Sequence, residues 1–128
     1  MSKFNQMAER LLELPTEISD LQLQILDRTD VVSTTQEKIQ VIESKIKSDI
    51  NNAVDANGKK VYSNEDARKA AFIEDTADNS ELKELNLVVA DQQRFIQEKR
   101  IQVEALSNEQ RNLRTLLHFF ANSVELAD

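Results

Sequence analysis

His118 is the only histidine of the chain, and it lies in an apolar stretch with Leu116, Leu117, Phe119 and Phe120. A histidine can serve as a general base or a metal ligand, but a metal site needs several ligands at suitable spacing. The chain has no second histidine and no cysteine, and no nucleophile elbow accompanies His118. We therefore predict no catalytic residues, no metal site, no cofactor and no enzymatic activity.

The segment Asp55-Ala56-Asn57-Gly58 is similar to part of a calcium-binding loop. That loop requires an acidic residue at position 1, a glycine at position 6 and a glutamate at position 12. With Gly58 at position 6, the two acidic positions hold Ala53 and Asn64. The sequence therefore does not predict calcium binding.

Basic and aromatic residues gather around the same segment. Such residues together can bind phosphates and stack on bases. Acidic residues, among them Glu65 and Asp66, are interleaved with them, so the pattern favours a solvated surface with ordinary ion pairs. The basic residues are Lys45, Lys47, Lys59, Lys60, Arg68 and Lys69, and the aromatic ones are Tyr62 and Phe72.

The composition indicates an acidic, helical chain. It has one glycine and one proline in 128 residues, far below the usual shares of about 7% and 5%, so few turns can form. The formal net charge is -7, and such a chain repels nucleic acid and anionic membranes. No apolar run approaches the ~20 residues of a membrane span, and the start lacks the apolar core of a signal peptide. We expect a cytoplasmic protein that contacts neither membrane nor nucleic acid.

Apolar residues recur every seven positions in both halves of the chain, which is typical of a coiled coil. One compact connector joins two halves of similar length, so the sequence predicts an all-α fold, a long antiparallel coiled-coil helical hairpin with short accessory helices. The predicted seam contains Phe4, Met7, Leu11, Leu14, Ile18, Leu21, Ile25, Val32, Ile39, Ile42, Ile46 and Ala53, then Leu82, Leu85, Val89, Ile96, Val103, Leu106, Leu113, Leu117, Phe120, Val124 and Ala127. Arg28, Thr35, Asp49 and Lys99 are polar positions within it.

Pro15 is expected to break the first helix, because proline lacks a backbone N–H and is best tolerated in a first turn. One kinked continuous helix is the alternative. Within a single domain over residues 1–128, we predict a short helix over 3–13, a long helix over 15–55, a connector over 56–79 with a short helix at about 64–75, and a long helix over 80–125.

Capping and turn residues support these boundaries. Asn57-Gly58 predicts a turn, Ser63 is the expected N-cap of the connector helix, and Asn79 or Ser80 that of the last helix. Symmetry about the connector then places Arg28 near Ser107.

A second set of apolar residues lies off the seam, and it includes Val31, Val41, Ile50 and Leu87. A two-helix hairpin buries one narrow stripe per helix, so a wider stripe implies a further helix surface, as in a bundle. We therefore predict a homo-oligomer, most simply a dimer, or a protein partner. The candidate interaction residues are Leu23, Leu26, Val88, Phe95, Ile101, Leu116 and Phe119, with Lys59, Lys60 and Tyr62 as an alternative surface at the connector.

The connector sequence over residues 57–71 contains a Gly-Lys turn, an aromatic residue and a Ser-Asn-Glu run followed by Arg68. Bridging two long polar helices, it resembles small uncharacterised coiled-coil proteins of phages and prophages. The resemblance extends over about residues 45–105 and implies a helical hairpin, without any activity. In outline the hairpin is also similar to prefoldin-like chaperone subunits, but their β-hairpins need more strand sequence than this connector offers.

These patterns favour a non-enzymatic helical module for protein–protein interaction or assembly, of phage or mobile-element origin. Two alternatives are a nucleic-acid accessory factor that uses the lysine-bearing connector, and a prefoldin-like holder chaperone that uses its apolar ends. Salt-dependent binding of DNA or RNA would distinguish the first alternative, and suppression of client aggregation would distinguish the second.

Overall fold

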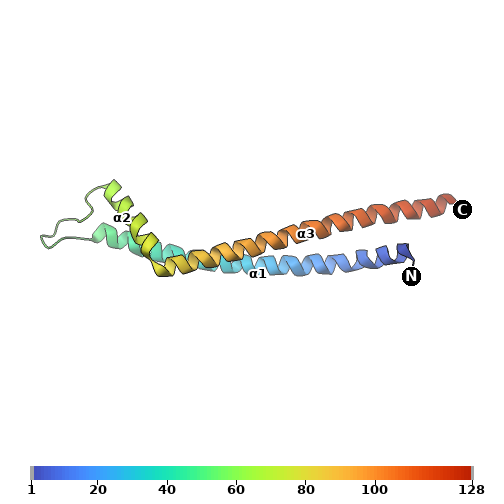
Figure 1. Ribbon diagram of the computed structural model, residues 1–128, viewed down its shortest axis with the longest axis horizontal. Helices are drawn as coiled ribbons and strands as arrows, with labels where there is room; N and C mark the ends of the chain where they lie inside the picture. Colours follow the sequence, from blue (N-terminus) through green and yellow to red (C-terminus); the bar gives the residue numbers. More distant parts are fainter. Residues whose placement is uncertain (1, 128) are drawn as a thin grey trace. The chain divides into compact units, whose positions relative to one another are not determined.

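The computed structural model describes residues 2–127, with side chains described for residues 2–123. The described chain forms three helices, α1 (Lys3–Asn52), α2 (Glu65–Asp78) and α3 (Ser80–Ala127) (Figure 1). The two long helices, α1 and α3, pack against each other. The all-α prediction is therefore confirmed for this part of the chain.

The seam predicted from the seven-residue repeat contains most of the buried side chains of the long helices; off-seam Ile50 is the exception. Leu14 and Leu82 are fully buried, and Val32 and Ile96 are buried. Thr35 is a buried polar residue, and its hydroxyl donates to the Val31 carbonyl at 2.7 Å. The repeat therefore identifies the core. Most other seam residues are half-buried, Phe4, Arg28, Asp49 and Phe120 are exposed, and Val124 and Ala127 lie outside the residues whose side chains are described.

The predicted break at Pro15 is wrong, because α1 continues through this residue. A proline inside a helix loses one backbone hydrogen bond and costs about 3 kcal/mol. Pro15 is exposed, whereas the adjacent Leu14 is fully buried in the seam. Packing of Leu14 and of the half-buried Leu11 and Ile18 on either side of Pro15 offsets that cost.

Contacts divide the chain into two compact units, each with a part of α1 and a part of α3. The first, called the terminal unit, comprises Met1–Thr29 and Arg94–Asp128. The second, called the connector unit, comprises Asp30–Gln93 and includes all of α2. A single domain over residues 1–128 stays a prediction.

The turn between α1 and α2 is built around Asp55 and Gly58. The Asp55 carboxylate accepts hydrogen bonds from the backbone N–H groups of Asn57 (2.8 Å) and Lys59 (3.0 Å). Gly58 has a φ of 78°, in the left-handed region that favours glycine, which confirms the predicted Asn-Gly turn. The extended backbone here is limited to one antiparallel bridge, Val54 with Lys60, and α1 ends at Asn52 rather than near residue 55.

The N-cap of α2 is Asn64 and not Ser63, so that prediction is wrong. Asn64 has extended backbone angles, and its side chain accepts a hydrogen bond from the Ala67 N–H at 2.8 Å. An asparagine carbonyl oxygen satisfies one of the unpaired N–H groups of the first turn. The side chain of Asn79 caps α3 in the same way, by accepting from the Leu82 N–H at 2.9 Å, as one of the two predicted alternatives.

The predicted pairing of α1 with α3 in the terminal unit is also wrong. The guanidinium of Arg28 lies 4.8 Å from the ring centroid of Phe95, and not near Ser107. Arg10 Nε lies 2.7 Å from Glu109 Oε1. In both contacts the partner on α3 comes earlier in the sequence than the predicted symmetry about the connector would place it. In the connector unit, α2 packs back against the last turns of α1, so α3 begins alongside α1 rather than beyond its end (Figure 1). The prediction placed α1 and α3 symmetrically about the connector and did not take into account that α2 returns along α1.

Replacement of Leu14 by alanine should destabilise the fold by about 2–5 kcal/mol, because the change removes fully buried methyl groups and leaves a cavity. Urea unfolding followed by circular dichroism measures the loss. The matched control is Val41→Ala on the same helix, where the side chain is 69% exposed, and it should leave the unfolding midpoint nearly unchanged. Equal midpoints for the two variants would place the seam elsewhere.

Replacement of Asn64 by alanine should cost about 0.5–2 kcal/mol, because α2 loses its N-cap acceptor. Hydrogen exchange at the Ala67 amide should accelerate, since this N–H then lacks its partner. Ser63→Ala serves as the control and should leave that exchange rate unchanged. Faster exchange in the Ser63 variant alone would restore Ser63 as the cap.

Candidate functional site

Among the described residues, eight large apolar side chains are exposed on the long helices of the terminal unit, and six of them are not part of the predicted seam, to which exposed Phe4 and Phe120 belong. Leu12, Leu23 and Leu26 on α1 form what we call the α1 outer face, and Ile101, Leu116 and Phe119 on α3 form the α3 outer face. Their exposed fractions range from 44% for Leu116 to 80% for Leu12. Five of the six are interaction candidates that the sequence predicts. The sixth, Leu12, is not among the predicted candidates.

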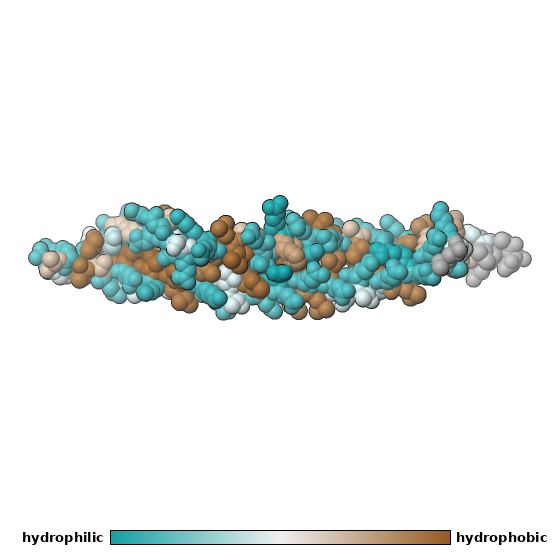
Figure 2. Space-filling view, turned by 60° about the horizontal axis from the view of Figure 1, so that its bottom comes forward, coloured by the Kyte–Doolittle hydropathy of each residue, from teal (hydrophilic) through white to brown (hydrophobic). Residues whose placement is uncertain are grey.

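The two outer faces lie away from the seam. At 3.6 residues per turn, Leu12 and Leu23 lie roughly 160–180° around α1 from buried Leu14, and Leu26 about 120°. On α3, Ile101 lies about 140° from buried Ile96, and Phe119 lies roughly 120–160° from the seam residues Leu113 and Leu117. Leu116 lies closer to the seam, about 60° from Leu113 and about 100° from Leu117. Figure 2 shows apolar residues dispersed among polar ones over the surface rather than collected in one patch. Since the seams of α1 and α3 face each other, the outer faces lie on opposite sides of the terminal unit.

Phe95 is a candidate interaction residue that the structure instead engages internally. Its half-buried ring has the Arg28 guanidinium 4.8 Å and the Lys99 ammonium 5.1 Å from its centroid. A cation over an aromatic face contributes roughly 0.5–1 kcal/mol at an exposed site. The Phe95 ring is thus engaged by two side chains of the same chain, and Phe95 is therefore not part of the α3 outer face.

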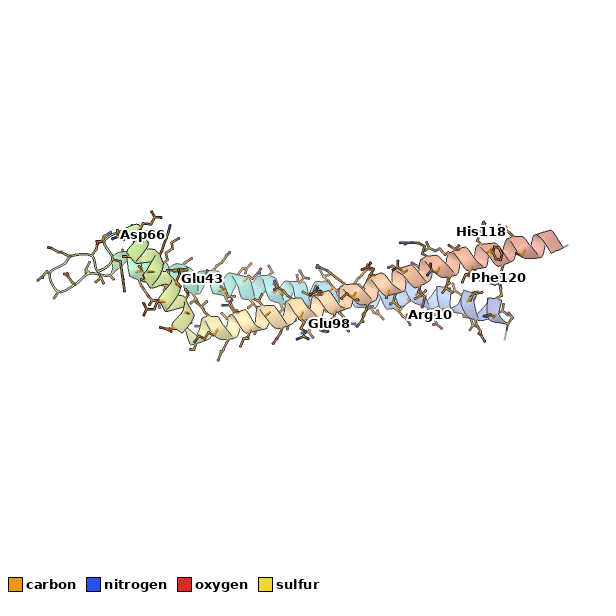
Figure 3. All side chains as sticks on the ribbon, turned by 45° about the horizontal axis from the view of Figure 1, so that its top comes forward. Arg10, Glu43, Asp66, Glu98, His118 and Phe120 are labelled. Carbon is orange, nitrogen blue, oxygen red and sulfur yellow. The ribbon has the colours of Figure 1, made fainter. Side chains whose placement is uncertain are left out.

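Arg10 is the centre of an ion-pair cluster that joins α1 to α3. Its guanidinium lies 2.7 Å from Glu109 on α3, 2.8 Å from Glu17 and 3.4 Å from Glu13. Hydrogen bonds to Glu17 and Glu109 raise the pKa of Arg10 above its ordinary value. The cluster holds Arg10 and Glu109 in a fixed pairing between the two helices (Figure 3 labels Arg10).

In the connector unit, one off-seam apolar residue is buried and the others are exposed. Ile50 is only 4% exposed and lies against α2, so the further helix surface expected at this off-seam residue comes from within the chain. Val31, Val41, Leu87 and the candidate Val88 remain exposed. The helix α2 therefore covers Ile50 at one end of the off-seam stripe and leaves the exposed residues of the stripe uncovered.

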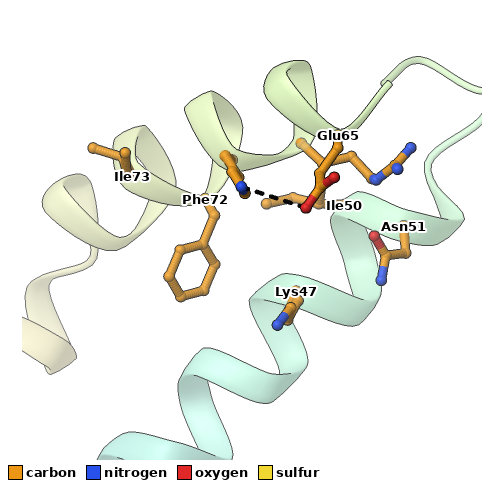
Figure 4. Close-up of a pocket in the computed structure, with 8 residues that line it drawn as sticks. Lys47, Ile50, Asn51, Glu65, Phe72 and Ile73 are labelled. Carbon is orange, nitrogen blue, oxygen red and sulfur yellow. Dashed lines mark ion pairs between the residues drawn. The ribbon is translucent and has the colours of Figure 1, made fainter. Parts of the chain in front are cut away.

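A cavity of about 470 Å³ lies between the end of α1 and α2. Figure 4 shows Phe72 of α2 extending toward Lys47 of α1, with Ile50 behind them and the Lys69–Glu65 ion pair (3.3 Å) above. The remaining lining residues are Asn51, Arg68 and Ile73. The lining combines apolar, basic, acidic and amide side chains.

The connector candidates Lys59 and Lys60 are exposed, and Tyr62 is half-buried. The Tyr62 carbonyl accepts a hydrogen bond from Arg68 Nη1 at 3.4 Å. This bond fixes the backbone at Tyr62 against α2, while no ion pair within the described residues involves Lys59 or Lys60.

His118 is exposed on α3, and its Nε2 lies 3.3 Å from the Asn122 side-chain nitrogen (Figure 3). Within the described residues, no cluster of three or more histidine, cysteine, aspartate or glutamate side chains is placed to hold a metal ion. No described helix combines the length and apolar character required to cross a bilayer.

Comparisons with protein-family models, with curated proteins and with solved structures found no match to this chain. The candidate site therefore rests on the geometry of the chain itself, and the outer faces of the terminal unit are its most extensive unexplained feature.

Replacement of Lys59 and Lys60 by alanine should leave thermal unfolding unchanged, because neither side chain is in an ion pair and both are exposed. Tyr62→Ala is the comparison, and it should lower the melting temperature because it removes a half-buried ring. Circular dichroism melts of both variants provide the measurement. A melting temperature lowered by the lysine changes alone would contradict this assignment of roles.

Proposed function

We propose that this protein is a non-enzymatic helical assembly module whose long helices form an antiparallel coiled coil and whose outer faces bind further helices. The observation that carries the proposal is the exposure of Leu12, Leu23 and Leu26 on α1 and of Ile101, Leu116 and Phe119 on α3. Exposed leucines are ordinary singly, but repeated apolar residues along one helix face are typical of an interaction surface.

The opposite order of the contacts in the terminal unit supports the antiparallel part of the proposal. Arg10 pairs with Glu109, and the later residue Arg28 pairs with the earlier residue Phe95. Seam burial at seven-residue spacing supports coiled-coil packing. A second copy of the chain is the simplest source of the missing helices, because coiled-coil helices with widened apolar stripes associate into bundles.

We further propose a cytoplasmic location and an origin in a phage or mobile element. The absence of cysteine supports a reducing compartment. The sequence over residues 57–71, with its Gly-Lys turn and capping Asn64, supports the origin through its resemblance to phage and prophage proteins.

The proposed assembly predicts a concentration-dependent mass in light scattering. At micromolar concentration the protein should give at least twice the chain mass of 14.6 kDa, because burial of exposed apolar side chains drives helix association. The variant Leu23→Gln/Leu26→Gln/Ile101→Gln/Phe119→Gln should give the mass of one chain. Its helix content should equal that of the wild type, since glutamine is a good helix former and these sites are outside the seam.

Val41→Gln is the matched control, since Val41 is 69% exposed but belongs to the connector unit. It should assemble as the wild type does. A wild-type protein that stays a single chain throughout the micromolar range would refute self-assembly.

A further inference from the structure

We infer that copies of this chain assemble side by side through a heterologous contact, in which the α1 outer face of one copy packs against the α3 outer face of the next. The inference rests on the proposed self-assembly and specifies its geometry. Three features of the terminal unit carry it: the opposite placement of the two faces, their opposite charge, and their similar level along the helices.

Opposite placement comes from the seam. Leu23 lies about half a turn around α1 from buried Leu14, and Ile101 lies nearly as far around α3 from buried Ile96. A two-fold contact joins a surface patch to the same patch on another copy. Such a contact covers one of two opposite faces and leaves the other exposed. A contact between unlike faces covers both, in every copy that has two neighbours.

The two segments also carry opposite charge. Residues 3–29 of α1 contain five acidic and three basic side chains, whereas residues 94–123 of α3 contain five basic and three acidic ones. The segments are therefore net negative and net positive respectively. Charge of opposite sign favours contact between the α1 segment of one copy and the α3 segment of another over contact between two like segments.

Contacts within the chain leave this difference in place on α1, because Arg10 engages Glu13 and Glu17 of its own helix. Arg10 is held by Glu109 of α3 and Arg28 lies over Phe95, so two of the three basic side chains of the α1 segment are directed to the seam. Asp20 and Asp27 are exposed three residues before and four residues after Leu23. Residues at these spacings are neighbours on a helix surface, so the acidic side chains border the α1 outer face.

On α3, the contact with Arg10 engages one acidic side chain, and an ion pair within the helix engages one acidic and one basic side chain. Glu109 is occupied by Arg10, and Glu98 pairs with Arg94 at 3.6 Å, which leaves Glu104 as the remaining acidic side chain of the segment. Arg100, Arg111 and Arg114 are exposed, and no ion pair within the described residues involves them. The exposed charge of this segment is therefore predominantly positive.

The register brings Leu23 of α1 and Ile101 of α3 to similar levels. The helices run in opposite directions, so Arg28 over Phe95 places Leu23 level with Arg100, and Arg10 against Glu109 places it level with Ile96. A neighbouring copy in the same orientation, without any shift along the helix, would bring its Leu23 within about one and a half helical turns of Ile101. Its Asp27 would then lie within about one to two helical turns of Arg100. The apolar contact and the charged contact therefore require the same register.

The inference is tested by mixing two variants, each of which lacks one of the two outer faces. The first variant, Leu23→Gln/Leu26→Gln, lacks the α1 outer face, and the second, Ile101→Gln/Phe119→Gln, lacks the α3 outer face. Sedimentation velocity at micromolar concentration should show single chains for each variant alone. An equimolar mixture should show a complex of two chains, because one intact face of each kind remains. Added salt should reduce this complex, since charge contributes to the contact.

Each alternative gives a different pattern. An α1–α1 contact would let the second variant dimerise alone, and an α3–α3 contact would let the first do so; either result overturns the heterologous contact and leaves self-assembly in place. A mixture that stays as single chains while the wild type assembles overturns it too. A wild type that never assembles refutes the proposed function itself. Val41→Gln should assemble as the wild type does, and circular dichroism should show equal helix content in all variants.

Discussion

The narrow seam between two long helices is the constraint on which the rest of this structure depends. A pair of helices can bury only the stripe that each turns toward the other. In this chain that stripe contains Leu14, Val32, Leu82 and Ile96, and it is continuous enough to carry α1 through Pro15 without a break. Apolar side chains beyond the stripe stay exposed unless another surface covers them, so the architecture itself generates uncovered faces.

The two units meet this constraint differently. In the connector unit, α2 returns along the last turns of α1 and covers Ile50, with Phe72 between the helices. Over the described residues of the terminal unit there is no accessory helix, and outer residues such as Leu23 and Ile101 remain exposed. The chain therefore contains an example of how an off-seam residue is covered by a third helix. A neighbouring copy would supply in the terminal unit what α2 supplies in the connector unit.

The seven-residue repeat predicted the helices and the seam, because burial of a side chain on a long helix follows directly from its position around the axis. Pro15, Ser63 and the pairing of Arg28 were predicted wrongly for separate reasons. Continuity at Pro15 depends on packing of Leu14, the choice between adjacent caps depends on the backbone angles at Asn64, and the pairing depends on the direction in which α2 leaves the turn. Of the candidate residues, Leu23, Leu26, Ile101, Leu116 and Phe119 are exposed as the pattern requires, whereas Phe95 could not be distinguished from them without the positions of Arg28 and Lys99.

Ion pairing inside the terminal unit has consequences on its outside. Arg10 and Arg28 stabilise one register of α1 against α3, since Arg10 binds Glu109 of α3 as well as Glu13 and Glu17 of its own helix, and Arg28 lies over Phe95. The excess of acidic residues on α1 and of basic residues on α3 comes from the composition of the two segments. Loss of Arg10 would affect two properties together: it would remove a contact that sets the register, and it would leave Glu13, Glu17 and Glu109 without this partner. In the proposed assembly, the internal register of one copy therefore determines how the next copy can bind.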